Sequence, residues 1–169
     1  MSHDLITISD ELGLRALKAE EAATLFKLTD DNRVYLAEFL PWVPHVKTVE
    51  DSREFIEKNI QEKAGGITYG YGVFFHDELI GHASLMYIES DKTPEIGYWI
   101  AEEFSGRGIT TQVALALREL AGDLGLAQLA LRANTQNIAS NRIAEKCGFS
   151  LEETKLTNGE QTNFWLYKF

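Results

Sequence analysis

The sequence predicts a mixed α/β fold in which helices cover both faces of a mostly antiparallel sheet. Apolar residues alternate with other residues in about seven segments, which is the period of a β-strand. In other segments they recur every three or four residues, which is the period of an α-helix. Strands that form hairpins come before two strand–helix units, and this order is typical of a mixed sheet. With 169 residues, 44% hydrophobic and 25% charged, the chain is expected to form a single domain over residues 1–169.

The N-terminal part of the chain is expected to contain one strand and three helices. Residues 12–17 (LGLRAL) alternate between apolar and other side chains, and residues 20–29 place apolar side chains at helical spacing. Residues 35–44 (YLAEFLPWVP) predict a short helix that ends before the first proline and gives way to an irregular loop. Thr48 and Asp51 have the spacing of a capping box, with aspartate in place of glutamate, and open the third helix.

The rest of the chain alternates between strands, tight turns and further helices. Asp77 and Glu78 are expected to form the turn of one hairpin, and Asn158 and Gly159 the turn of another. Gly148 follows a helix at the position where a left-handed C-terminal cap is expected. In order, the elements are strands at 69–76, 79–88 and 95–101, a helix at 109–124, a strand at 128–133, a helix at 138–147, and strands at 151–156 and 161–169.

Charge and composition exclude several classes of function. The formal net charge is -10, which repels the phosphates of nucleic acid and suits a cationic acceptor such as an amine. No apolar run reaches the roughly 20 residues that span a bilayer, and the N-terminus does not resemble a signal peptide. The single cysteine, Cys147, fits a reducing cytoplasm. No metal site is expected, because ligand spacing is missing among the histidines: His3, His45, His76 and His82.

The segment Ser105–Thr111 (SGRGITT) joins a predicted strand to a predicted helix. The first turn of a helix leaves about four backbone N–H groups without partners, and the helix dipole adds to their attraction for an anion. Gly106 and Gly108 have no Cβ, so phosphate oxygens can approach the main chain closely. Arg107 and the threonine hydroxyls could add further donors. The glycines fit equally well a tight strand-to-helix turn that binds nothing.

Two nucleotide-binding motifs do not fit this loop. The dinucleotide fingerprint G-x-G-x-x-G would need glycine where Thr111 stands, and the pattern G-x-x-x-x-G-K-[ST] of triphosphate sites is not met. No acidic residue lies between Ser105 and Arg118, although the chain as a whole is acidic. The loop therefore predicts a pyrophosphate ligand that is neither a Rossmann nucleotide nor a nucleoside triphosphate.

A second polar cluster follows the strand at 128–133 and enters the next helix: Asn134, Asn137, Ser140 and Asn141. Helix capping explains Asn137 but not the whole set. Together with the glycine loop, the run N-x-x-S-x-x-x-x-x-K-x-G-F, from Asn137 to Phe149, resembles the GNAT superfamily of N-acetyltransferases. Ser105 and Thr110 depart from that family's loop pattern, which has glutamine or arginine at the first position and glycine or alanine at the last.

Within that superfamily, the chain resembles the branch that acetylates the N-terminal alanine or serine of ribosomal proteins. The resemblance runs from Leu12 to Phe169 and rests on the stretches LGLRALKAEEAATLFKL, YLAEFLPWV, EIGYWIAEEFSGRGITTQVA and NIASNRIAEKCGF. It implies the GNAT fold, in which a central, twisted, mostly antiparallel sheet is flanked by helices and splayed between its two central strands.

The resemblance also implies that the cofactor is acetyl-coenzyme A (acetyl-CoA). The loop amides would hold its pyrophosphate, and the strand at 95–101 would run beside its pantetheine arm, where the splay frees main-chain groups. The serine- and asparagine-rich helix would form the other wall. The cofactor-binding residues implied are Trp99, Ile100, Ala101, Ser105, Gly106, Arg107, Gly108, Ile109, Thr110, Thr111, Asn137, Ser140 and Asn141.

The family transfers acetyl directly to an amine, which needs a base for the amine and a proton donor for the departing thiolate. Glu95 is the first candidate for the base and Glu160 the second, although both also fit ordinary exposed acids. Ala144 stands where many relatives carry a tyrosine donor, so the resemblance gives that role to Ser140, whose alternative role is cofactor binding. An apolar acceptor wall is expected from Trp42, His45, Tyr98 and Trp165, although such aromatics are often core residues.

Several functions remain open at this point. The first is acetylation of a primary amine at the N-terminal alanine or serine of a protein, ribosomal proteins included. The second is acetylation of a small-molecule amine, such as a polyamine or an antibiotic. The third is a non-enzymatic acyl-CoA-binding sensor. Neither nucleic acid nor a membrane is expected as a partner, and a homodimer is the default oligomer.

Overall fold

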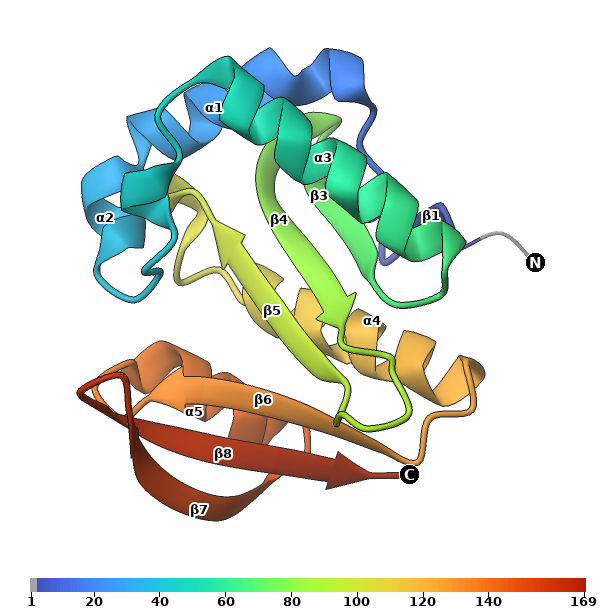
Figure 1. Cartoon of the computed structure of the whole chain (residues 1–169), viewed down its shortest axis with the longest axis vertical. Coiled ribbons are helices and arrows are strands. Elements are labelled where there is room, and N and C mark those ends of the chain that lie inside the picture. Colours follow the sequence, from blue (N-terminus) through green and yellow to red (C-terminus); the bar gives the residue numbers. More distant parts are fainter. Residues whose placement is uncertain (1–2) are drawn as a thin grey trace.

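The structure, a computed structural model, describes residues 3–169, which form a sheet of eight strands in the order β1-β2-β3-β4-β5-β6-β8-β7 (Figure 1). Neighbouring strands are antiparallel except β5 and β6, which are parallel. The strands are β1 (Leu5–Thr7), β2 (Leu12–Arg15), β3 (Tyr69–Phe75), β4 (Glu78–Met86), β5 (Glu95–Ile100), β6 (Gln128–Asn134), β7 (Ser150–Thr157) and β8 (Glu160–Lys168).

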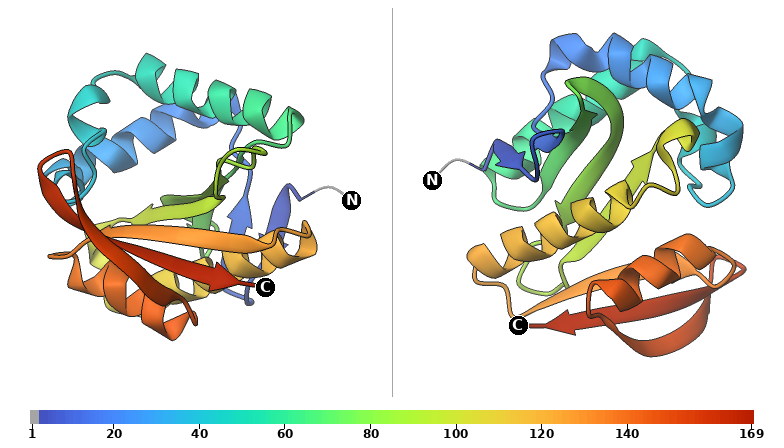
Figure 2. Two further views of the ribbon diagram at one scale, coloured as in Figure 1. Left: turned by 60° about the horizontal axis from the view of Figure 1, so that its bottom comes forward. Right: turned by 180° about the vertical axis from the view of Figure 1, so that it is seen from behind.

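Helices cover both faces of the sheet, as predicted. α1 and α3 pack together on one face, over β3 and β4, while α4 and α5 lie on the other (Figure 2). The helices are α1 (Ala22–Asp31), α2 (Arg33–Ala37), α3 (Val49–Ala64), α4 (Ile109–Asp123) and α5 (Ile138–Lys146), with short 3₁₀ helices η1 (Ala19–Glu21), η2 (Val43–His45) and η3 (Glu102–Phe104). Within residues 3–169, every helix is too short or too polar to span a bilayer.

Each face of the sheet has its own hydrophobic layer. Leu14, Val73 and Leu117 have no exposed surface and belong to the larger layer, which joins the sheet to α4 and α5. Leu25 of α1 and Ile56 of α3 are buried in a smaller cluster on the opposite face. Burying one such side chain contributes roughly 1.5–3 kcal/mol, so these layers fix the helices against the sheet.

The predictions for helix ends and for the last hairpin are confirmed. The Thr48 side chain accepts a hydrogen bond from the Asp51 amide at 3.2 Å, and the Asp51 carboxylate accepts one from the Thr48 amide at 3.0 Å. Gly148 follows α5 with a φ of 83°, as a left-handed cap requires. Asn158 and Gly159 turn β7 into β8 with φ values of 51° and 82°.

One hairpin turn differs from its prediction, and the sheet has an additional strand. The turn between β3 and β4 is formed by His76 and Asp77, with φ values of 49° and 62°. The predicted turn at Asp77 and Glu78 is wrong because Glu78 already pairs with Phe75. The additional strand, β1, pairs with β2. Its three residues are too few for an alternating pattern to be recognised in the sequence.

The expected splay is confirmed, and it lies between β5 and β6. These strands pair at one position only, Glu95 with Ala130. Beyond this position they diverge toward their C-terminal ends (Figure 1). We call this diverging stretch, residues 96–100 of β5 and 131–134 of β6, the seam.

The seam leaves main-chain groups of β5 without a strand neighbour. The Ala101 amide donates to the Ile80 carbonyl of β4 at 2.7 Å. Main-chain groups of successive residues point to alternate edges of a strand, so those of Tyr98 and Ile100 face β6. Because β6 has moved away there, these amides and carbonyls are free to bind a ligand that enters the seam.

On its other side, β5 lies unusually close to β4 at Gly81. A Cβ built on Gly81 would lie 2.1 Å from the Trp99 carbonyl oxygen and 2.8 Å from Ile100 Cα, both main-chain atoms. A Cβ on Gly97, in β5, would meet only the Met86 Cε at 3.0 Å, which is the end of a flexible side chain. The main-chain atoms of β5 therefore require glycine at position 81.

Gly81→Ala is expected to destabilise the fold, because β4 and β5 must separate to accommodate the methyl group. We expect the free energy of unfolding, measured by urea denaturation, to fall by about 1–3 kcal/mol. Gly97→Ala is the matched control and should lose clearly less, because the Met86 side chain can move aside. Equal losses for the two variants would contradict the close contact at Gly81.

Candidate active site

The loop between β5 and α4 presents main-chain amides to solvent. Gly106 and Gly108 have φ values of 76° and 77°, and a Cβ at either position would meet nothing within 4 Å. Within residues 3–169, the amides from Gly106 to Thr111 find no acceptor, whereas the next amide, that of Gln112, bonds to the Gly108 carbonyl. The loop therefore has the main-chain geometry of an anion site at a helix N-terminus.

The polar side chains of this loop are largely engaged by the protein. The Arg107 guanidinium donates to the Glu103 carbonyl at 3.2 Å and lies 5.3 Å from the centre of the Phe104 ring. The Ser105 hydroxyl donates to the Glu102 carbonyl at 2.6 Å. The main chain, more than these two side chains, is the part of the loop that is open to a ligand.

Some of the residues predicted to bind the cofactor are buried. Ile100, Ala101 and Ile109 belong to the hydrophobic core, so only their main-chain groups can contact a cofactor. Thr110 and Thr111 are half-buried in the first turn of α4 and keep part of their surface exposed.

α5 begins directly after β6 and carries the second polar cluster. The Asn137 side chain accepts a hydrogen bond from the Ser140 amide at 3.2 Å, so the capping explanation for Asn137 is confirmed. Ser140 lies in the first turn of the helix and is half-buried. Along the chain, Ser140 comes shortly after the C-terminal end of β6, where the seam is open.

Asn141 binds only to the protein. Its amide nitrogen donates to the carbonyls of Asn134 and Asn137 at 3.0 and 2.8 Å. Its oxygen accepts from Asn163 at 2.9 Å and from the Trp165 indole at 2.8 Å. All the hydrogen-bonding positions of the amide are used, so Asn141 ties α5 to β6 and β8 and has no capacity left for the cofactor that the sequence assigned to it.

The predicted acceptor wall is divided between the two faces of the sheet. Trp42 and Trp99 lie with ring centres 6.1 Å apart, and Trp99 packs on the α1 and α3 side. His45 is exposed one turn after Trp42, and its amide donates to the Trp42 carbonyl at 3.0 Å. Tyr98 and Trp165 belong to the layer on the α4 and α5 side. The four side chains expected to form one wall therefore do not, because neighbours in a strand point to opposite faces.

Glu95 is largely buried and paired with Arg132 of β6. The guanidinium contacts both carboxylate oxygens, at 2.6 and 3.1 Å. Burial raises the pKa of Glu95, and the positive charge of Arg132 opposes this shift. Glu95 shares its face of β5 with Gly97 and Trp99, and the end of the Met86 side chain lies over Gly97.

Glu160 lies at the other end of β6. Its side chain is exposed and accepts a hydrogen bond from the Asn134 amide at 2.9 Å. The two predicted bases are thus held at opposite ends of the seam, one beside the position where β5 and β6 pair and the other at the open end.

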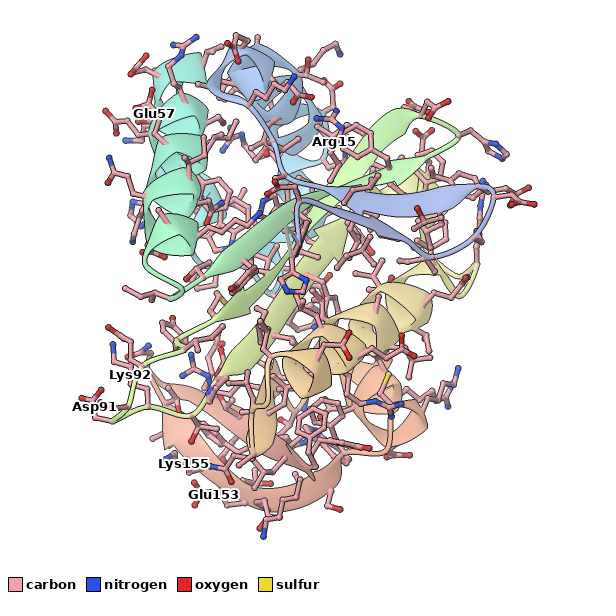
Figure 3. All side chains as sticks on the ribbon, turned by 90° about the vertical axis from the view of Figure 1, so that its right-hand side faces the viewer. Arg15, Glu57, Asp91, Lys92, Glu153 and Lys155 are labelled. Atoms are coloured by element: carbon pink, nitrogen blue, oxygen red, sulfur yellow. The ribbon has the colours of Figure 1, made fainter. Side chains whose placement is uncertain are left out.

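A groove that the sequence did not indicate lies beside Glu95. It has a volume of about 520 Å³ and crosses the helix-free face of β6, β8 and β7 under the loop between β4 and β5. Figure 3 shows Asp91 and Lys92 of that loop on the same side of the molecule as Glu153 and Lys155 of β7. The lining residues are Tyr87, Lys92, Thr93, Glu95, Ala130, Arg132, Glu152, Glu153, Phe164, Trp165 and Leu166.

Arg132 is the residue of this site that the sequence analysis missed. It stands between the buried Leu131 and Ala133 in a strand that otherwise looks like an ordinary half-buried one. A charged side chain on the outer face of such a strand is common, so nothing local marked it as the partner of Glu95.

Comparisons with known proteins agree with this geometry. The ribosomal-protein-serine acetyltransferase of Escherichia coli (strain K12) is 33% identical over 151 residues, which cover 88% of this chain and 84% of that protein. The solved structure of RimL, a ribosomal L7/L12 alpha-N-protein acetyltransferase in complex with coenzyme A, matches with a TM-score of 0.91 and 29% identity, over 97% of both chains.

Another solved structure has the same fold over its whole length. The microcin C7 self-immunity acetyltransferase MccE, in complex with acetyl-CoA and AMP, matches with a TM-score of 0.91 and 26% identity, over 99% of this chain and 98% of that one. The family model for the acetyltransferase (GNAT) domain matches residues 11–150, which include the loop, the seam and α5. The chain therefore belongs to the GNAT acetyltransferases and is an acetyl-CoA-dependent N-acetyltransferase.

Proposed function

We propose that this enzyme acetylates the N-terminal amine of a protein, with alanine or serine as the favoured first residue and ribosomal proteins as the favoured substrates. The observation that carries the proposal is the 33% identity with the ribosomal-protein-serine acetyltransferase over 88% of the chain. The open groove beside Glu95 adds support, because an extended peptide can leave the reaction centre along it without entering a closed pocket.

The chain offers a continuous set of contacts for the cofactor, which supplies the acetyl group as an activated thioester. The amides from Gly106 to Thr110 bind the diphosphate at the N-terminus of α4. The main-chain groups of Tyr98 and Ile100 bind the amides of the pantetheine arm along the seam, in the way a neighbouring strand would. Ser140 closes the far wall from the first turn of α5.

Proton transfer at the acceptor amine is assigned to Glu95. An N-terminal α-amine has a pKa of about 7.7–8.0, so a small shift is enough to make it neutral and nucleophilic. Glu95 lines the groove, and its burial raises its pKa toward neutrality, which improves a carboxylate as a base. The carboxylate takes the proton, directly or through one water, as the nitrogen bonds to the acetyl carbon. Ser140 acts at the departing sulfur, and Trp42 with Trp99 forms the apolar wall for the first residue of the acceptor.

Gly108→Ala is expected to weaken binding of coenzyme A by about tenfold or more, because a Cβ would occupy the space in front of the loop amides. Gly125→Ala is the matched control, since Gly125 has a φ of 76°, lies just beyond the C-terminal end of the same helix and also has nothing within 4 Å of a built Cβ. Both variants carry the same backbone strain, so only the first should lose affinity in titration calorimetry. If Gly108→Ala binds coenzyme A with unchanged affinity, the diphosphate does not bind at this loop.

Glu95→Gln is expected to lower kcat by roughly 10²- to 10⁴-fold, because the amide keeps the shape but cannot accept a proton. The wild-type enzyme should lose activity as the pH falls through the raised pKa of Glu95, since the base works only above that pKa. In the variant this acid limb of the pH profile should disappear, leaving the limb set by the amine. Glu160→Gln is the comparison: if it causes the larger loss and Glu95→Gln leaves the profile unchanged, Glu160 is the base.

Mass spectrometry of the products identifies the acceptor. Peptides that begin with serine or alanine should gain one acetyl group at the α-amine, and the same peptides with a blocked N-terminus should remain unmodified even when they contain lysine. If spermidine is acetylated and no peptide is, the substrate is a small-molecule amine and the proposed protein substrate is wrong. Binding of acetyl-CoA without amine-dependent release of free thiol would instead indicate a sensor.

A further inference from the structure

A buried hydroxyl beside the seam lacks a partner. Within residues 3–169, the Tyr98 hydroxyl oxygen has no hydrogen bond and no solvent contact. Leaving a buried polar group unsatisfied costs about 1–3 kcal/mol, so such groups are rare unless they serve a purpose. The main chain of Tyr98 borders the seam, while its side chain packs against the core layer on the α4 and α5 side.

The Tyr98 side chain reaches from β5 toward α5. It packs against the core layer that contains Ala144 of α5 and Cys147, which directly follows α5, and both of these side chains are completely buried. The small side chain of Ala144 leaves room for a large one from the opposite strand. The Tyr98 hydroxyl interacts electrostatically with Ser140 and Cys147, so it lies across from the α5 residue to which we assign proton donation.

The two hydroxyls are close but not yet bonded. Burial raises the pKa of Tyr98 to about 12, and the neighbouring Ser140 hydroxyl opposes this shift, although their geometry falls short of a hydrogen bond. Tyr98 therefore stays protonated at every pH at which the enzyme would be assayed. A phenol in that state can donate a hydrogen bond but cannot serve as the base or as a strong acid.

Ser140 has one hydroxyl hydrogen and two lone pairs, so the direction of that hydrogen depends on the groups that face the hydroxyl. Its backbone amide is already held by Asn137, so the side chain alone remains to be oriented. A donor that occupies one lone pair on the Ser140 oxygen leaves the serine hydrogen to point elsewhere, toward the seam. Tyr98 is the buried donor placed to do this.

We propose that Tyr98 is a positioning residue, which donates its hydroxyl hydrogen to the Ser140 oxygen and so directs the Ser140 hydrogen at the cofactor sulfur. The proposal rests on the function proposed above, in which Ser140 acts at that sulfur. With acetyl-CoA bound, Ser140 would give its proton to the departing sulfur and recover one from water, and the proton that Glu95 takes from the amine would return to the solvent, so that the protons balance. Tyr98 keeps its own proton throughout and strengthens the donor by polarising it.

A double-mutant cycle tests this arrangement. Tyr98→Phe is expected to lower kcat about tenfold, the effect of one lost hydrogen bond, while KM for acetyl-CoA stays within about twofold of wild type. Ser140→Ala should lower kcat at least as much. Because Tyr98 acts through Ser140, the double variant should be no slower than Ser140→Ala alone. Tyr167→Phe is the control, since it removes a phenol hydroxyl from β8 on the same face of the sheet and should leave kcat and KM unchanged.

Binding provides a readout that does not depend on turnover. Titration calorimetry should show that wild type prefers coenzyme A to desulfo-coenzyme A, and that Tyr98→Phe and Ser140→Ala each reduce this preference. Affinity for desulfo-coenzyme A, which lacks the sulfur, should be the same in all three proteins. Thermal melting of each variant checks that it folds.

Several results would overturn the proposal. Losses of kcat that multiply in the double variant would show that Tyr98 acts independently of Ser140. A higher KM with unchanged kcat, or equal loss of affinity for both coenzyme A forms, would show a purely structural tyrosine. If Ser140→Ala leaves kcat unchanged, the positioning role is lost, but the acceptor is still identified by the mass of the acetylated peptide.

Discussion

The site depends on the single position at which β5 pairs with β6. Glu95 and Ala130 hold the parallel strands together there, and the ion pair from Glu95 to Arg132 bridges the same two strands on the helix-free face. Past this position β5 has no strand neighbour on one side, and main-chain groups away from water need a partner. A sheet that is paired along its whole length would have no such groups to offer to a cofactor.

The parallel pairing also explains why two helix N-termini lie at the same edge of the sheet. A parallel pair needs a crossover connection, and α4 supplies it between β5 and β6. α4 therefore starts near the end of β5, and α5 starts near the end of β6, at the edge where the strands have separated. Loop amides from one helix and a serine hydroxyl from the other are brought to the same opening by topology, as at the carboxyl edges of other parallel sheets.

Features that depend on local backbone chemistry could be predicted from the sequence, and features that join distant elements could not. The turn at Gly106 and Gly108 could be predicted from their spacing, because residues without Cβ atoms adopt the positive φ values found there. The pair of Glu95 and Arg132 depends on the register of two strands that are separated by a whole helix. The saturated amide of Asn141 depends on two strands and a helix end meeting at one point, which no spacing in the sequence reports.

Asn141 gives the molecule an unusual chemical vulnerability. Its nitrogen faces two main-chain carbonyls, while its oxygen receives two N–H groups. Deamidation, the slow hydrolysis that ages asparagine in proteins, would preserve the shape of the side chain but replace that nitrogen by oxygen. Two carbonyls would then oppose a carboxylate, and the joint between α5 and the sheet would become repulsive. An exchange of one atom at this joint would thus loosen the helix that carries Ser140.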